Sequence, residues 1–528
     1  LPKARAKPLP AIVYVCGHAN SPQGNKTQYQ RHGISFAKNG YAALILDSIQ
    51  IAETFALHHG VHSQQMPDWY ARGYTPAGVE VWNAIRAIDY LETRPEIDRD
   101  RIGMTGRSGG AAMTWFTAAV EPRIRVAVPV MGNSTYAANL EANTQQHHCD
   151  CMFCINVYRH DMTHQGALIA PRPLLMMHGE KDVLFPVPGY TAFEQSMARL
   201  YTGYGHADRF RNIVVPTGHT DSDFLREQAI RWFDTHLMGV SERKLDLDYS
   251  NAPPEQLAVF GGNPPAGARN HTLHETFTAR PPSPRYQSPA AWQTRSAALS
   301  AAIAGLLAAP PDQPPVRTDL YKPKPGPAKV PALLYIAADG DDRELHRQLL
   351  AGVNGRNSAV RMVVWPRGVN EVPWSNIFAR DTLRNAMHVG ETIDSLRLHD
   401  IRAAYRRLRE MPEVDPARIM IAGRGVSGAL GLYAAILEPS VWQVLLLDPP
   451  VSHRQGPIFL NILRHTDLPE AAALLAPRRL IFFGHMPPEY EYTRHVYGLL
   501  GKPDRISLAM NIEYVLEGRY DHGMASGR

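Results

Sequence analysis

Short apolar runs alternate with amphipathic segments through the first 240 residues of the chain. Runs of aliphatic and β-branched residues predict buried strands at 12–15, 41–47, 101–105, 126–130 and 173–178. The segment 78–95 has apolar residues at helical spacing and stops at a proline, which predicts a helix. Strands that alternate with helices are typical of an α/β domain with a parallel, doubly wound sheet.

The same series of segments recurs in the second half of the chain. VPALLYIAADGDD (330–342) matches LPAIVYVCGHANS (9–21), and LLAPRRLIFFGHMPPE (474–489) repeats LIAPRPLLMMHGEKDV (168–183). Between these pairs, a segment that ends in GRG at Gly425 repeats, without a gap, the one that ends in GRS. Three matches in the same order indicate duplication of a whole domain rather than two unrelated α/β domains.

The repeat predicts two α/β domains in tandem, at 1–240 and 328–528. Residues 241–327 between them are rich in proline, which predicts a connector of turns and extended segments with one Ala-rich helix near 290–308. The formal charge of +5 and the lack of a basic block speak against nucleic acid as a partner, and no apolar run is long enough for a membrane span. The chain starts at Leu1 without a signal-like apolar segment, so we expect a form whose targeting segment is not present.

One motif of the first domain points to nucleophilic catalysis. Gly106-Arg107-Ser108-Gly109-Gly110 stands between a predicted strand and a predicted small-residue helix, as in a nucleophile elbow, where side chains at the flanking positions would clash. Asp182 and His219 each follow a later predicted strand, in the chain order serine, acid, histidine that such a triad takes in this fold. Asp221 and Asp223 are competing acids, but they are too near His219 in sequence to approach it easily from the far side.

An acyl-transfer site also needs donors for the oxyanion and a surface for the substrate. We predict the backbone N–H groups of Gly109 and His18 as the oxyanion donors. Aromatic residues that could stack on sugar rings or line an acyl pocket are Trp69, Tyr74 and Trp115, with His59 as a further substrate contact. Each of these aromatic residues could equally belong to the core.

The first half resembles the α/β-hydrolase superfamily, in the bacterial branch of acetyl xylan esterases and dienelactone hydrolase-related proteins. The resemblance rests on YVCGHAN, GRSGG, HCDCMF, APRPLLMMHGEKD and GHTD, and covers most of residues 10–240. It places the triad of the family on Ser108, Asp182 and His219. It implies a serine carboxylic-ester hydrolase without a cofactor, a substrate such as an acylated carbohydrate or another small ester, and a periplasmic or secreted location. The alternative functions are a non-catalytic two-domain glycan-binding protein and a peptidase of the same fold. The sequence does not indicate the oligomeric state.

Cysteine and histidine residues crowd into two short segments. In HHCDCMFC, Cys151 and Cys154 could bind a metal together with His147 or His148, or Cys149, Cys151 and Cys154 could form a local disulfide. A second ligand pair at the usual spacing is missing, so we expect no metal and assign these residues to packing in a cap formed by 131–168. His58, His59 and His62 form another candidate ligand group, for which we favour loop packing or substrate contact.

The second copy lacks the catalytic residues. Alignment of the repeats puts Gly425 at the position of Ser108 and Pro488 at that of Asp182, while His522 is the expected counterpart of His219. Ser427 does not restore an elbow, because alanine follows where the second glycine should stand. We therefore expect one active hydrolase domain and one degenerate copy, which could supply a cleft wall or a glycan-binding surface.

Overall fold

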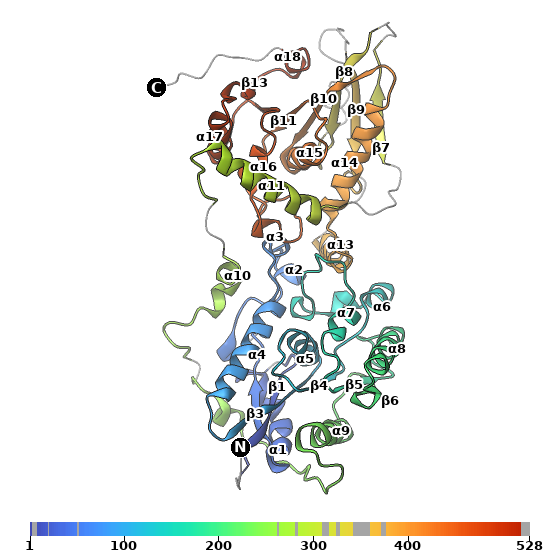
Figure 1. The fold of residues 1–528 in the computed structure, drawn as a ribbon, viewed down its shortest axis with the longest axis vertical. Coiled ribbons are helices and arrows are strands. Elements are labelled where there is room, and N and C mark those ends of the chain that lie inside the picture. Colours follow the sequence, from blue (N-terminus) through green and yellow to red (C-terminus); the bar gives the residue numbers. More distant parts are fainter. Residues whose placement is uncertain are drawn as a thin grey trace. The chain divides into compact units, whose positions relative to one another are not determined.

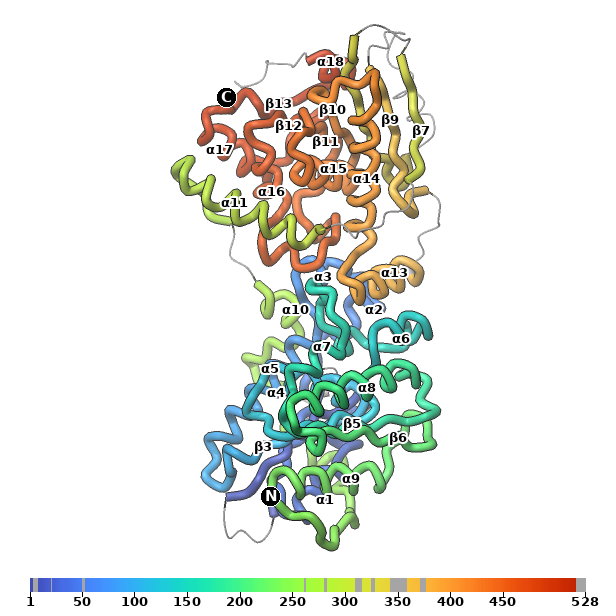
Figure 2. Tube along the Cα trace, turned by 45° about the vertical axis from the view of Figure 1, so that its right-hand side comes forward, coloured from blue at the N-terminus to red at the C-terminus, as the bar shows by residue number. Residues whose placement is uncertain are grey.

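The computed structural model describes residues 1–2, 8–19, 21–49, 52–260, 263–279, 283–308, 316–323, 328–341, 359–370 and 376–518. The chain divides into two compact units, which are drawn as a ribbon in Figure 1 and traced as a tube in Figure 2. The first unit contains Leu1–Gln65 and Tyr74–Ala279, and the second contains Met66–Gly73 and Arg280–Arg528. No helix in the described ranges combines the length and hydropathy that a membrane span requires.

The first unit is built on a six-stranded, entirely parallel sheet with the order β2-β1-β3-β4-β5-β6. The prediction of a doubly wound parallel sheet is confirmed. The strands are β1 (Leu9–Val15), β2 (Ala42–Leu46), β3 (Ile97–Arg107), β4 (Val126–Val130), β5 (Leu174–Gly179) and β6 (Phe210–Val215). The α-helices are α1 (Gln30–Lys38), α2 (Gly60–Ser63), α4 (Pro76–Glu92), α5 (Gly109–Val120), α6 (Tyr136–Glu141), α7 (Met162–Ala167), α8 (Val187–Gly203), α9 (Asp223–Phe233) and α10 (Leu273–Thr276).

Helices pack on both faces of this sheet. Alternate residues of β1, Ile12 and Tyr14, lie in one apolar cluster with Phe36 of α1 and Phe233 of α9. On the other face, α4 and α5 lie side by side against β1 and β3 (Figure 1). The sheet therefore separates two apolar layers, and β1, β4 and β5 are buried along their whole length.

The second unit has a seven-stranded sheet with the order β13-β12-β11-β10-β8-β9-β7. All neighbouring pairs are parallel except β7 with β9. The strands are β7 (Arg317–Tyr321), β8 (Val330–Ile336), β9 (Val360–Trp365), β10 (Val414–Arg424), β11 (Gln443–Leu447), β12 (Arg479–Phe483) and β13 (Ile506–Ala509). The α-helices are α3 (Asp68–Arg72), α11 (Pro289–Leu306), α13 (Asn376–His388), α14 (Ile393–Arg409), α15 (Gly425–Leu437), α16 (Leu468–Ala473), α17 (Glu491–Leu499) and α18 (Ile512–Leu516).

The two units repeat each other in topology and in detail. Without β7, the order of the second sheet corresponds strand by strand to that of the first. Arg172, just before β5, donates a hydrogen bond to the carbonyl oxygen of Ala118 at the end of α5, at 2.5 Å. At the equivalent place before β12, Arg478 donates to the carbonyl oxygen of Ala435 at 2.7 Å. The two units thus share the strand order and this arginine contact, and their origin by duplication stays a prediction.

The units differ from the predicted domain boundaries in two respects. The proline-rich connector is divided: Ala252 donates its N–H to Gln30 within the first unit, whereas Arg295 of α11 pairs with Glu470 within the second. The segment 66–73, which contains α3, belongs to the second unit, where the N–H of Asn461 donates to a carbonyl oxygen of this segment at 2.8 Å. Contacts made by a short excursion of this kind leave no periodic signal in the sequence.

Candidate active site

Ser108 occupies the turn between β3 and α5 in a strained conformation. Its φ of 59° and ψ of −122° lie outside the regions that L-residues ordinarily adopt. The turn is possible because its neighbours are glycines: a Cβ on Gly106 would lie 2.5 Å from the carbonyl oxygen of Val15, and one on Gly110 would come still closer to the same atom. This is the geometry of a nucleophile elbow, which presents the serine hydroxyl at the end of a strand.

Asp182 and His219 are in direct contact. The Nδ1 atom of His219 lies 2.7 Å from Oδ2 of Asp182, which is only 5% exposed. The other carboxylate oxygen of Asp182 accepts the N–H of Leu184 at 3.0 Å, and Arg107 donates to the main-chain carbonyl of His219 at 2.6 Å. These contacts fix the carboxylate and orient the imidazole of His219, so that its Nε2 atom is available to accept a proton.

Neither competing acid reaches His219. Asp221 contacts His32 Nε2 at 2.8 Å and Arg31 at 3.0 Å, while Asp223 pairs with Arg226. Burial, the largest single effect, raises the pKa of Asp221, but the hydrogen bond from His32 together with the positive charges of His32, Arg31 and Arg107 lowers that pKa to about 2.

Ser108 makes no hydrogen bond to His219 within the described part of the chain, although β3, β5 and β6 present the elbow, Asp182 and His219 at the same edge of the sheet. Catalytic hydrogen bonds are often long in enzymes without substrate and tighten when the substrate binds. The structure therefore brings the acid and the histidine together and leaves the last contact of the predicted triad open.

The predicted oxyanion donors lie beside the nucleophile. A Cβ on Gly109, the first residue of α5, would lie 2.7 Å from Cε1 of the His18 ring. A Cβ on Gly17 would lie 3.2 Å from Cβ of Ser108. The turn that follows β1 therefore packs directly against the elbow, on which the predicted oxyanion role of the two N–H groups depends.

The three aromatic residues predicted to contact the substrate are buried in this structure. Trp69, Tyr74 and Trp115 are 0%, 1% and 0% exposed, so no face of these rings is open to a sugar. Trp115 donates its indole N–H to the carbonyl of Met162 at 3.2 Å, and Trp69 belongs to α3 in the second unit. Aromatic residues at single positions carry no signal in the sequence that separates a core residue from a binding surface.

Four side chains of the first unit converge next to His18. We call His18, His58, Cys149 and Cys151 the Cys–His cluster, because their ligand-type atoms all lie within 4.8 Å of one another. The Nε2 atoms of His18 and His58 are 2.9 Å apart, and Sγ of Cys151 lies 3.2 Å from Nε2 of His18. Hydrogen bonds from Cys151 and then from His18 and His58 hold the pKa of the Cys149 thiol well below its usual range. His59 is half-buried, and its ring lies 5.1 Å from that of His58.

This cluster differs from the groupings considered in the sequence. Cys154, His147 and His148 are not part of it, and all four cysteines of the chain are free thiols, so no local disulfide is formed. Sequence reasoning missed the set because its members come from segments 40 and 133 residues away from His18. The signal that could have pointed to the cluster was His18, shortly after the first predicted strand, together with the two segments rich in cysteine and histidine.

The second unit has a glycine and a proline at the positions aligned with Ser108 and Asp182. Gly425 has a φ of 56°, close to that of Ser108, but it has no hydroxyl, and Pro488 begins a 3-10 helix at the aligned position of the acid. His522 lies outside the described residues. The positive φ therefore recurs at the aligned position of the second unit, where the residue has no hydroxyl.

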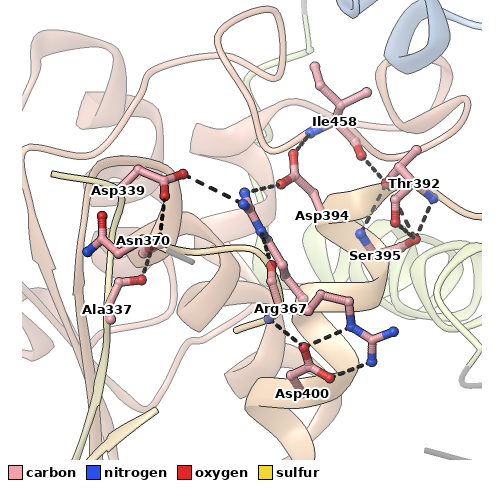
Figure 3. A network of polar contacts seen from close by, with 11 residues as sticks. Ala337, Asp339, Arg367, Asn370, Thr392, Asp394, Ser395, Asp400 and Ile458 are labelled. Atoms are coloured by element: carbon pink, nitrogen blue, oxygen red, sulfur yellow. Dashed lines mark hydrogen bonds and ion pairs between the residues drawn. The ribbon is translucent and has the colours of Figure 1, made fainter. Parts of the chain in front are cut away.

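A cavity of about 630 Å³ lies over this elbow, within the second unit. Arg397 stands in its wall between two carboxylates, 3.6 Å from Asp339 and 3.5 Å from Asp394. The N–H of Ile458 donates to Asp394 at 2.7 Å (Figure 3). Arg424, next to the glycine at the elbow, also lines the cavity. The cavity is polar, and the serine in its wall, Ser427, donates its hydroxyl to the carbonyl of Ala337 at 2.9 Å.

The first unit is similar in sequence to known proteins. Residues 1–147 match the model of the acetyl xylan esterase (AXE1) family. The chain is 26% identical over 247 residues to YtaP of Bacillus subtilis (strain 168), a protein named as a hydrolase, across 45% of this chain and 81% of that one.

Solved structures that resemble the chain include esterases. The methylesterase BT1017 matches with a TM-score of 0.40 and 20% identity, over 51% of this chain and 59% of the methylesterase, so the chain spans less than two thirds of that protein. A carbohydrate esterase family 15 glucuronoyl esterase from Caldicellulosiruptor kristjansonii matches with a TM-score of 0.36 and 20% identity, over 47% of this chain and 75% of that one. The first unit is therefore an α/β-hydrolase-like domain, and its residues 1–147 match the acetyl xylan esterase family.

Proposed function

We propose that the first unit hydrolyses carboxylic esters through an acyl-enzyme on Ser108. The observation that carries the proposal is the 2.7 Å contact between His219 and a buried Asp182, next to a serine held in the elbow conformation. A serine hydroxyl is a weak nucleophile near pH 7, so it needs a base that is held in the correct tautomer. The carboxylate supplies this by keeping the proton on Nδ1, which leaves Nε2 as the base.

The reaction follows in two steps. Oγ of Ser108 attacks the ester carbonyl carbon while Nε2 of His219 takes the hydroxyl proton, and the N–H groups of Gly109 and His18 stabilise the oxyanion. The bond to the alcohol then breaks, and His219 returns the proton to the leaving oxygen. Water, deprotonated by the same imidazole, hydrolyses the acyl-enzyme and restores the serine.

The proposed substrate is an acylated carbohydrate, with acetyl as the first acyl group to test. This choice rests on the match of residues 1–147 to the acetyl xylan esterase family. It does not rest on the aromatic side chains Trp69, Tyr74 and Trp115, because these are buried. An extracellular or periplasmic location is part of the same proposal, since polysaccharides of this kind lie outside the cell.

The test uses the full chain with an acetylated xylo-oligosaccharide, with the methyl ester of glucuronic acid and with a fluorophosphonate. We expect acetate release, slower or no methanol release, and a covalent fluorophosphonate adduct that peptide mass analysis places on Ser108. Methanol release faster than acetate release would contradict the proposal that acetyl is the acyl group. A chain that is folded but neither releases acetate nor forms the adduct would contradict the esterase.

We further propose that the cavity of the second unit binds carbohydrate without catalysis. A volume of about 630 Å³ suits a short oligosaccharide, and guanidinium and carboxylate groups in the wall can bind hydroxyl groups by hydrogen bonds. The pocket keeps the place of an active site while Gly425 and Pro488 replace the catalytic groups.

Binding is measured by calorimetry on the full chain with Ser108→Ala, so that ligand is not consumed. We expect Arg424→Ala in this background to weaken xylo-oligosaccharide binding by about tenfold, or ~1.4 kcal/mol. Arg409→Ala is the matched control, because Arg409 is exposed at the end of α14 and does not line the cavity. Equal affinities in the two variants would contradict the proposal.

A further inference from the structure

We propose that the Cys–His cluster of the first unit, His18, His58, Cys149 and Cys151, binds one Zn²⁺. Two thiolate sulfurs and two imidazole nitrogens are a common ligand set of structural zinc in proteins. The four ligand atoms lie within 4.8 Å of one another, and they come from three separate segments of the chain. Packing alone gives no reason for two imidazole nitrogens and two sulfurs to point at one spot.

The spacing of the atoms is close to what the ion would impose. With bonds of about 2.0 Å to nitrogen and 2.3 Å to sulfur, the corners of a zinc tetrahedron are about 3.3 to 3.8 Å apart. The separations of 2.9 Å between the two imidazoles and 3.2 Å from Cys151 to His18 are a few tenths of an ångström shorter. The other ligand atoms lie within 4.8 Å of one another, so side-chain shifts of about an ångström or less bring all four to these separations.

The groups around the ligands are arranged as at a metal centre. His58 donates from Nδ1 to the carbonyl of Ile49 at 3.0 Å, which leaves the Nε2 lone pair aimed into the cluster. Ligating histidines in proteins usually make such a second hydrogen bond. The carboxylate of Asp150, between the two cysteines, accepts the N–H groups of Val61 and His62 at 2.9 and 3.0 Å. It thereby ties the cysteine segment to the residues that follow His58.

Burial favours a bound ion over free thiols and imidazoles. Cys151 is 0% exposed and His58 is 3% exposed, so water replaces few of the bonds that these groups lose on folding. Zinc binds both sulfurs as thiolates, so each sulfur that is still protonated releases one proton on binding, and the resulting Zn(SR)₂ unit has no net charge to bury.

Four protein ligands leave no open coordination position, so this zinc has a structural role. Its effect on catalysis passes through His18, whose ring packs against Gly109 and whose N–H is a proposed oxyanion donor. The zinc would fix the turn after β1 against the elbow and anchor the 149–151 segment next to it. This positioning role rests on the proposed function, whereas the metal site itself does not.

The test measures metal in the full chain purified from zinc-supplemented medium. We expect one zinc per chain by elemental analysis, and thiolate-to-cobalt charge-transfer absorption after exchange with Co²⁺. Cys149→Ser and Cys151→Ser should each lower the bound zinc at least tenfold and abolish the cobalt absorption. Cys154→Ser is the matched control, because this neighbouring cysteine lies outside the cluster, and it should keep one zinc. Less than a tenth of a zinc per chain in the unaltered protein, or equal loss in all three variants, would overturn the site.

A second measurement does not depend on how the variants fold. Removal of zinc from the unaltered chain by a chelator should lower the melting temperature of the first unit by several degrees, and added Zn²⁺ should restore it. It should also lower kcat for an acetate ester with little change in KM. A melting curve that zinc leaves unchanged would overturn the proposal.

The two proposals fail in different ways. Ser108→Ala should retain one zinc per chain although it hydrolyses nothing. Hydrolysis with no bound zinc would overturn the metal site and leave the esterase, whereas one bound zinc without hydrolysis by the unaltered chain would overturn the esterase and leave the metal site.

Discussion

Replacing Ser108 with alanine is expected to lower kcat for a chromogenic acetate ester by about 10⁴- to 10⁶-fold, with KM changed only a few-fold. The substitution removes the only atom that forms the acyl bond, while the oxyanion donors and the substrate contacts remain. The measurement is steady-state hydrolysis, with circular dichroism to show that the variant is folded. Loss of activity below tenfold in a folded variant would contradict the role of Ser108 as nucleophile.

The second unit offers a matched control for this result. Gly425 stands at the position aligned with Ser108 and has a positive φ of 56°, so Gly425→Ser places a hydroxyl at the aligned turn. The double variant Ser108→Ala/Gly425→Ser should remain inactive, because Pro488 stands where a carboxylate would be needed to orient a base. Recovered hydrolysis would contradict the interpretation of the second unit as degenerate.

The sequence predicts the fold of both units well, because the fold depends on patterns of apolar residues. A strand buried on both faces has to be apolar throughout, and the glycines around Ser108 are required by close contact with β1. The repeated sequence segments give a second basis for the alignment of the two units. Arg172 and Arg478 stand at aligned positions, and each donates to a carbonyl oxygen at the end of the equivalent helix. These are local requirements that each segment has to satisfy by itself.

Contacts between distant segments leave weaker traces. Asp182 could be predicted because the order of catalytic groups along this fold is fixed, whereas the Cys–His cluster has no fixed order or spacing. Trp69, Tyr74 and Trp115 were expected at the substrate, but a buried aromatic residue and a binding one look alike in sequence. The assignment of α3 to the second unit depends on contacts such as the hydrogen bond from Asn461 to Tyr70, which the spacing of apolar residues along the sequence does not predict.

Replacing Asp182 with asparagine is expected to lower kcat by about 10⁴-fold at neutral pH. The amide nearly preserves the shape of the carboxylate, but it can donate a hydrogen bond to Nδ1 of His219. The imidazole then carries its proton on Nε2, the atom that has to accept a proton from Ser108. The measurement is kcat for the same ester, compared with Asp182→Ala, which tests whether loss of the group and inversion of the tautomer have similar effects.

Asp221→Asn is the control that separates the two candidate acids. Asp221 binds His32 and Arg31 rather than His219, so its amide should leave kcat within a few-fold while lowering the melting temperature through the lost ion pair. If Asp221→Asn instead abolished hydrolysis and Asp182→Asn did not, His219 would have to turn away from the carboxylate that it now contacts at 2.7 Å. The burial of Asp182 argues against such a turn, because it would leave that charge unpaired inside the protein.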